Sequence, residues 1–163
     1  MASRSINDLH PCTRKKVRLF LKYAKDAGID VLIYCTYRSP EEQHVLYMQG
    51  RLDEYGITTD DLNRVREEIG LYPISEKEAN RIVTNAKPWE SFHQYGLAFD
   101  CVPLQGGKPD WDNTVAYSIL GDIALKVGLT WGGTWENFKE YPHFQDDETY
   151  EHILTIYKKH HGD

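Results

Sequence analysis

Short β-rich runs set between amphipathic helices constrain the fold of this chain more than any other feature of its sequence. Apolar residues recur at helical spacing over residues 13–27, and Gly28 follows them, a residue suited to the left-handed cap that ends a helix. Residues 31–34 are β-rich, residues 97–102 alternate as a strand does, and residues 113–127 are again amphipathic. Because helices and short strands follow each other in irregular order, we predict an α+β fold in which helices flank a small antiparallel sheet.

Two capping patterns mark the beginnings of further helices. Ser39 is placed to cap a helix that starts at Pro40, and Glu42 completes a capping box. Residues 75–78 repeat the pattern and open a short helix. Between the two helices the chain is polar and mixed in charge, with a short helix expected over residues 60–69, and we interpret residues 52–80 as an insertion that forms a surface excursion.

The size and composition of the chain indicate one folded unit. Its 163 residues are 40% hydrophobic, enough to bury a core without disulfide or metal support, so we expect a single domain over residues 1–163 and a monomer. Three cysteines form no CxxC pair, which indicates neither a disulfide framework nor a cysteine-based zinc site.

Charge and hydrophobicity argue against two classes of partner. The net charge of −6 disfavours a nucleic-acid binder, which needs clustered basic residues on one face. The basic cluster Arg14, Lys15, Lys16 and Arg18 lies beside apolar residues at helical spacing, so we interpret it as a solvated helix face. No segment is long enough to span a membrane, and residues 1–8 contain no apolar run typical of a secretory signal. We therefore expect synthesis in the cytoplasm.

Two segments contain residues suited to metal chemistry. His93 precedes a bend permitted by Gly96, and Asp100 lies in the strand that follows. His143 is preceded by Pro142, and Glu140 is three residues before it. A catalytic zinc site needs three protein ligands of these types, and a carboxylate that does not bind the metal to carry a proton. No HExxH pair is present, so residue spacing alone leads no further than a metal site.

The order of these residues resembles the zinc-binding motifs of a known peptidase family. That family contains D-alanyl-D-alanine carboxypeptidases, D-Ala-D-Ala dipeptidases and phage L-alanyl-D-glutamate endolysins, and the resemblance lies in Ser91-x-His93-x-x-Gly96-x-Ala98-x-Asp100 followed by Glu140-x-Pro142-His143. Tyr37-Arg38-Ser39, Gln43 and residues 49–51 and 83–88 look most like the endolysin branch. The resemblance implies the zinc fold shared by D,D-peptidases and hedgehog domains.

The resemblance also implies a role for each site residue. One zinc ion would be held by His93, Asp100 and His143, with Glu140 as general base and acid. Arg38 matches an arginine near the substrate, which would hold a substrate carboxylate or steady the oxyanion, although a structural ion pair is the alternative. Ser91 is interpreted as a hydrogen-bonding residue of the turn and not as a nucleophile.

The implied reaction is hydrolysis of the L-alanyl-D-glutamate bond in bacterial peptidoglycan by a phage endolysin. Such an enzyme would be made in the host cytoplasm and reach the wall after a holin permeabilises the membrane, and no direct contact with the holin is implied. The alternatives are a D,D-carboxypeptidase or dipeptidase acting on D-Ala-D-Ala, and a non-catalytic zinc-binding module like the hedgehog domain. Glu140 argues against the last, because a structural zinc site has no use for a proton carrier.

Three departures from the family pattern concern the substrate groove. Endolysins of the family often have Asp where this chain has Glu140, and a small residue where it has Trp89, and residues 52–80 are inserted. Aromatic residues also surround the approach to His143, and they either form a wall for the substrate or belong to the core: Trp131, Trp135, Phe138 and Tyr141.

Overall fold

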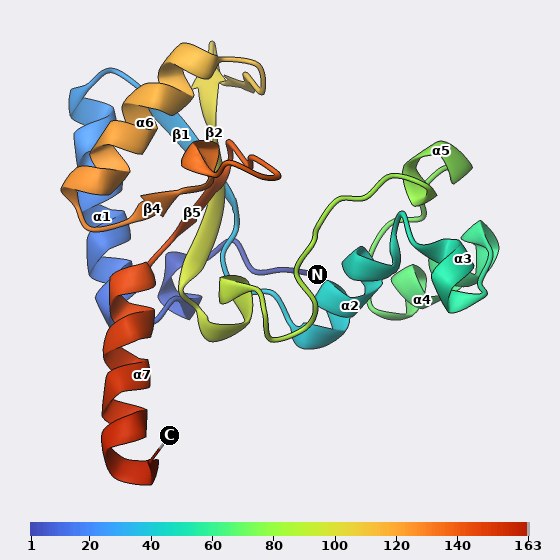
Figure 1. Ribbon diagram of the computed structural model, residues 1–163. Helices are drawn as coiled ribbons and strands as arrows, with labels where there is room; N and C mark the ends of the chain where they lie inside the picture. The colour runs from blue at the N-terminus through green and yellow to red at the C-terminus, as the bar shows by residue number, and fades with distance from the viewer. Residues whose placement is uncertain (163) are drawn as a thin grey trace.

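A five-stranded antiparallel sheet organises the larger part of the molecule in the computed structural model, which describes residues 1–162 (Figure 1). The strand order is β1-β2-β5-β4, with β3 paired to β2. The strands are β1 (Asp30–Cys35), β2 (Ala98–Gln105), β3 (Lys108–Pro109), β4 (Thr130–Trp131) and β5 (His143–Gln145). The predicted α+β architecture with a small antiparallel sheet is confirmed.

Two long helices cover one face of this sheet. They are α1 (Pro11–Asp26) and α6 (Thr114–Lys126), each amphipathic and each followed two residues later by a glycine with positive φ. Phe20 of α1 packs on Phe99 and Phe144 of the sheet, with ring centroids 5.3 and 5.0 Å away, and Leu120 of α6 is fully buried in the same cluster. We call this unit, the sheet with α1 and α6, the sheet lobe.

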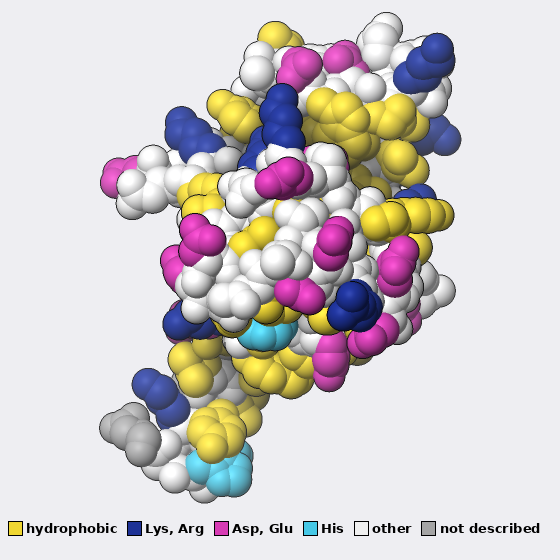
Figure 2. Space-filling model, turned by 90° about the vertical axis from the view of Figure 1, so that its right-hand side faces the viewer, with side chains coloured by type: hydrophobic (Ala, Val, Ile, Leu, Met, Phe, Trp, Pro, Cys, Tyr) yellow, Lys and Arg dark blue, Asp and Glu magenta, His cyan; other side chains and the backbone are white. Residues whose placement is uncertain are grey.

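A second group of four short helices lies to one side of the sheet lobe (Figure 1). They are α2 (Pro40–Met48), α3 (Leu52–Tyr55), α4 (Thr59–Glu68) and α5 (Glu76–Ala79), and we call them the helical lobe. Figure 2 views this side, where acidic, basic and hydrophobic side chains are interspersed. The lobe has its own apolar cluster, which includes Val45, Leu52 and Leu62. Residues 52–80 are therefore more than the expected surface excursion, because they fold onto α2 around a buried core.

The helix starts agree with the capping patterns except in one detail. The box predicted at Ser75 and Glu78 is formed. Ser39 accepts a hydrogen bond from the backbone N–H of Glu42 at 3.1 Å, but within residues 1–162 the Glu42 side chain returns none to Ser39. The predicted box at this helix is therefore wrong. Glu42 is instead buried, with its carboxylate 3.5 Å from the ammonium group of Met1.

The last helix, α7 (Asp147–His161), projects away from both lobes (Figure 1). Asp146 caps it and is fully buried, and Lys16 of α1 donates to its carboxylate at 2.6 Å and to that of Glu148 at 2.9 Å. The prediction that the basic face of α1 is solvated is therefore wrong at Lys16, whose side chain links α1 to the start of α7. Within residues 1–162 no helix combines the length and apolar character needed to cross a bilayer.

Candidate metal centre

Sheet register places two of the predicted ligands side by side. Asp100 on β2 lies directly opposite His143 on β5, and the next pair along the ladder is Phe99 with Phe144. Because successive strand residues face opposite sides of a sheet, the phenylalanines point into the core and the polar pair points away from it. Nδ1 of His143 lies 3.1 Å from Oδ1 of Asp100.

His93 reaches the same carboxylate from the turn before β2. It lies in a 3-10 helix, η2 (Phe92–Tyr95), which Ser91 caps and Gly96 ends with a φ of 68°. A side chain on Gly96 would approach the backbone of Asp8 to 3.1 Å, so both the turn and the packing require glycine. Nε2 of His93 lies 3.2 Å from Oδ1 of Asp100. The structure thus brings together His93, Asp100 and His143, and it confirms Ser91 as a turn residue.

The outer nitrogen of each imidazole is held by a hydrogen-bond acceptor. Nδ1 of His93 lies 2.7 Å from the carbonyl oxygen of Thr36, and Nε2 of His143 lies 2.8 Å from Oε1 of Gln145. The Gln145 amide is oriented by donating to Asp147 at 2.7 Å. Each outer nitrogen must therefore carry the proton in a neutral ring, which leaves both lone pairs pointed at the Asp100 carboxylate. Such an arrangement is favourable only with a cation or an additional proton between the groups.

Burial and charge act in opposite directions on these three groups. Burial lowers the pKa of His93. Burial also acts to lower the pKa of His143, but its hydrogen bond to Asp100 outweighs this effect and raises the pKa above its usual value. Burial acts to raise the pKa of Asp100, but the charges of the histidines hold it well below its usual range. The carboxylate stays ionised, as a metal ligand must be.

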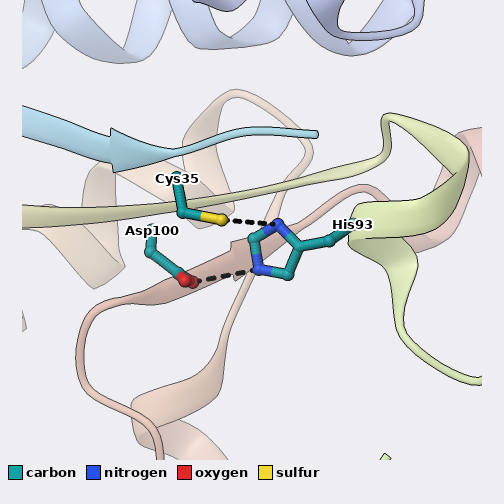
Figure 3. Close-up of side chains that lie close together, drawn as sticks. All are labelled: Cys35, His93 and Asp100. Atoms are coloured by element: carbon teal, nitrogen blue, oxygen red, sulfur yellow. Dashed lines mark hydrogen bonds and ion pairs between the residues drawn. The ribbon is translucent and has the colours of Figure 1, made fainter. Parts of the chain in front are cut away.

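A cysteine that the sequence did not indicate lies beside these residues. Ligand atoms of Cys35, His93 and Asp100 lie within 4.8 Å of one another (Figure 3). Figure 3 shows Cys35 and Asp100 at different nitrogens of the His93 ring. Sγ of Cys35 is 3.6 Å from Nδ1, the nitrogen already held by Thr36. Burial raises the pKa of the thiol to about 12, so we place Cys35 behind His93 as a neutral neighbour and not as a fourth ligand.

Glu140 lies at the edge of the site without entering the ligand group. Its Oε2 is 3.8 Å from Nδ1 of His143, and burial raises the pKa of its half-buried carboxyl group. The loop that carries it packs on another 3-10 helix, η3 (Gly132–Thr134), where Glu140 N–H donates to the Gly132 carbonyl at 3.1 Å. A side chain on Gly132 would come within 2.5 Å of the Glu140 carbonyl oxygen, so this close approach requires glycine.

Arg38 follows β1 and forms the structural ion pair that the sequence left open as an alternative, while its expected role toward the substrate stays a prediction. Its Nη2 lies 3.6 Å from Oδ2 of Asp100, which is an ion pair, and its Nη1 donates to Oε1 of Gln43 at 3.0 Å. Gln43 is itself buried and donates to the carbonyl of Ala86. Nε of Arg38 is buried without a hydrogen-bond partner in the described part of the chain. The guanidinium is therefore fixed beside the ligand group while it lines the adjoining cavity.

A cavity of about 1100 Å³ opens onto the site and extends along both lobes. Trp135, Phe138 and Tyr141 line it, and the Trp135 ring centroid is 5.2 Å from that of His143. A role for these three as a wall for the substrate stays a prediction, whereas Trp131 packs against the core and donates to the Tyr141 carbonyl. Trp111, which the sequence did not single out, also lines the cavity.

Sequence reasoning missed two residues beside the site, Cys35 and Gln145, and for Cys35 the reason is that its signal is a contact between strands. Cys35 pairs with Asp100 across β1 and β2 next to an irregularity in register, since Ile33 already pairs with Cys101. One extra residue, Tyr34, bulges there and lines the cavity. Gln145 was within reach of sequence reasoning, because a residue two positions after His143 on a strand shares its face.

Comparisons with known proteins agree with this geometry. The D-alanyl-D-alanine carboxypeptidase family matches residues 84–146, which contain all three predicted ligands and Glu140. The peptidoglycan L-alanyl-D-glutamate endopeptidase CwlK of Bacillus subtilis is 33% identical over 154 residues, covering 85% of this chain and 74% of the relative. The L-alanyl-D-glutamate peptidase of Listeria phage A118 is 27% identical over 146 residues, covering 86% of this chain and 39% of that longer protein.

The fold has solved counterparts as well. A variant of the vancomycin-resistance D,D-pentapeptidase VanY, solved in complex with Zn(II), superimposes with a TM-score of 0.56 at 16% identity, covering 91% of this chain and 78% of that one. Sequence and fold lead to the same assignment. The chain is an enzyme that belongs to the D-alanyl-D-alanine carboxypeptidase family of peptidases, the M15 peptidases.

Proposed function

We propose that this chain is a zinc-dependent endopeptidase that hydrolyses the L-alanyl-D-glutamate bond in the stem peptides of bacterial peptidoglycan. The observation that carries the proposal is the convergence of two imidazole lone pairs on the Asp100 carboxylate, with the outer nitrogens of His93 and His143 held by Thr36 and Gln145. Acceptors on the outer nitrogens are typical of metal-binding histidines, because they fix the ring and its tautomer.

The donor set fits zinc. Two imidazoles and a carboxylate form a three-ligand catalytic site that leaves a coordination position for water, and the ionised state of Asp100 suits the metal. The VanY counterpart was solved with Zn(II). In this chain we assign the ligand atoms Nε2 of His93, a carboxylate oxygen of Asp100 and Nδ1 of His143. Zinc bound there would supply a Lewis acid and lower the pKa of a bound water.

The remaining residues divide the chemistry between them. Glu140 is half-buried beside His143, with a raised pKa that suits a group taking a proton from the attacking water and delivering it to the leaving amine. Arg38 places a permanent positive charge beside the site, where it holds a substrate carboxylate or the developing oxyanion. Trp135 and Phe138 line the cavity beside the site, where they would shield one side of the scissile bond from water.

The choice of substrate follows the two curated relatives, both named for the L-alanyl-D-glutamate bond. The test is mass spectrometry of purified peptidoglycan digested by the zinc-loaded protein. We expect new D-glutamate N-termini, lost after chelation and in Glu140→Gln. The matched control is Glu136→Gln, an exposed residue of the same loop, which should retain activity. Loss of terminal D-Ala would assign the D,D-carboxypeptidase reaction instead, and no metal-dependent product would contradict the proposal.

We also propose that the enzyme acts in phage lysis, a setting supported by the similarity to the Listeria phage peptidase. The protein would be made in the host cytoplasm and reach the wall only after a holin permeabilises the membrane. Expression in a bacterial host with and without a co-expressed holin tests this. Lysis that requires the holin is the expected result, whereas lysis or extracellular activity without it would show another route of delivery.

A further inference from the structure

A buried arginine of the helical lobe lines the same cavity as the metal centre, although it is distant from the proposed ligands in the sequence. Arg66 of α4 is 8% exposed, and only one of its three guanidinium nitrogens has a partner within the described part of the chain. Nε donates to the Tyr72 carbonyl at 2.8 Å. Nη1 is buried without any hydrogen-bond partner. A nine-tenths-buried cation with free donors is costly unless an anion completes it.

The acidic residues near Arg66 have other partners. Burial lowers the pKa of Arg66, and the charges of Glu42 and Glu78 act in the opposite direction. The Glu42 carboxylate lies 3.5 Å from the Met1 ammonium group, and that of Glu78 accepts from Ser75 in the capping box. Among residues 1–162 no carboxylate forms an ion pair with Arg66. The described residues therefore leave Arg66 without an anionic partner, and the cavity that it lines gives an external anion access to it.

We propose that Arg66 forms a second anion site in the substrate cleft, which binds a carboxylate of the stem peptide beyond the D-glutamate residue. This inference rests on the proposed function. In a peptidoglycan stem the lactyl carboxyl group is already amidated by L-alanine, so the free carboxylates lie on the D-glutamate side of the scissile bond. Arg38 is beside the ligand group and serves the chemistry there, whereas Arg66 belongs to a different lobe and meets a more distant part of the same substrate.

The surroundings of Arg66 suit such a ligand. Ile74 and Ile82 line the same cavity and give an apolar wall for the stem of a side chain, and Gln49 and Arg81 add polar groups. A planar guanidinium also selects carboxylates by geometry, which a lysine would not do. Residues 52–80 of the helical lobe would thereby contribute to substrate specificity.

The experiment compares two peptides that differ only in this charge: N-acetyl-L-alanyl-γ-D-glutamyl-L-lysine with a free C-terminal carboxylate, and its carboxamide. We expect the zinc-loaded enzyme to favour the free acid by at least about tenfold in kcat/KM, as a charge-assisted hydrogen bond implies. Arg66→Met should bring this ratio close to one. Arg64→Met is the matched control, because Arg64 lies on the same helix with its side chain 73% exposed, and it should keep the preference.

Further measurements separate folding and function from recognition. Thermal unfolding will show whether Arg66→Met unfolds the helical lobe. Arg66→Lys keeps the buried charge, so in either case this variant should retain a reduced preference for the free-acid peptide. Calorimetry of the product γ-D-glutamyl-L-lysine should show binding that weakens in both variants. Cleavage of both peptides at equal rates by the unmodified enzyme would overturn this inference and keep the proposed function. Binding that depends on Arg66 without any cleavage would keep this inference and overturn the proposed function. If neither binding nor cleavage is detected, both proposals are overturned.

Discussion

The two lobes contribute to the site by different physical routes. In the sheet lobe, Asp100 and His143 meet because two strands far apart in sequence pair in one register, over a core of interlocked aromatic rings. In the helical lobe, Arg66 is placed by a ten-residue helix that packs on a small apolar cluster. The proposed metal centre, which needs ångström precision, is built on the lobe with the larger core, and the proposed second anion site is built on the lobe with the smaller core, where we expect local opening to cost less.

The largest effect should follow from removing Glu140, the proposed proton carrier in the sheet lobe. Glu140→Gln keeps the size and the loop contacts of the side chain but cannot take a proton from water. We expect kcat to fall by about 10²–10⁴, as is usual for a general acid and base, while thermal unfolding stays close to that of the parent. A variant that retains more than a tenth of the parent's kcat would remove Glu140 from the mechanism.

The next prediction compares the cores of the two lobes directly. Leu120→Ala and Leu62→Ala delete similar side chains, both fully buried, in α6 and α4. Each substitution should destabilise the lobe that contains it by about 2–5 kcal/mol in the free energy of unfolding. We expect Leu120→Ala to lower the global melting temperature, and Leu62→Ala to speed amide hydrogen exchange mainly over residues 40–80. Equal acceleration of exchange throughout the sheet in both variants would show that the lobes unfold as one unit.

The same comparison explains what the sequence could predict. Helix boundaries were accessible because their signals are local: Gly28 after α1 and the capping box at Ser75 lie within a few residues of the ends they mark. The convergence of His93, Asp100 and His143 could be predicted only through their family pattern, and their role as zinc ligands stays a prediction. Cys35 was not, because its place beside His93 depends on a register irregularity between β1 and β2 that no local pattern reveals.

The helical lobe was underestimated for a related reason. Its sequence is polar and mixed in charge, and the apolar residues of each short helix are too few to form a core by themselves. Val45, Leu62 and Ala79 bury each other only because three short helices converge. Glu42 illustrates the same limit, since a pattern four residues long predicted a capping box, whereas the distant Met1 ammonium group is the partner of the Glu42 carboxylate. Tertiary contacts decided both outcomes.

A smaller effect is expected where α7 is attached to the sheet lobe. Burial acts to raise the pKa of Asp146, but its bonds with Lys16 and Thr149 outweigh this and lower it below 3.8. Burial likewise acts to lower the pKa of Lys16, whereas Asp146 and Glu148 raise it above 10.5. The pair therefore stabilises the fold fully between these values, and its contribution is lost as pH falls through the folded pKa of Asp146 or rises through that of Lys16.

Substitution tests this attachment. Lys16→Met should destabilise the protein at neutral pH by about 1–3 kcal/mol, because it leaves a buried carboxylate with hydroxyl and amide partners only. Glu148→Gln is the control, since its side chain is 72% exposed and its ion pair should contribute about 1 kcal/mol or less. Denaturant titrations of the parent and of both variants from pH 2.5 to 7 provide the measurement. A Lys16→Met penalty that is unchanged at pH 2.5 would contradict the electrostatic account.

The smallest effect should arise at a helix end in the helical lobe, where it sharpens the contrast between the lobes. Thr58 caps α4, the helix that carries Arg66, and exchanges hydrogen bonds with Asp61. Thr58→Ala should cost about 1 kcal/mol, the usual value of such a cap. If the lobes open independently, this loss will appear as faster amide exchange in α4 and weaker discrimination between the two lysine peptides, with kcat for the carboxamide unchanged. A fall in kcat for both peptides would mean that the helical lobe also supports the metal centre. The assignment of catalysis to the sheet lobe and of substrate recognition to the helical lobe would then be wrong.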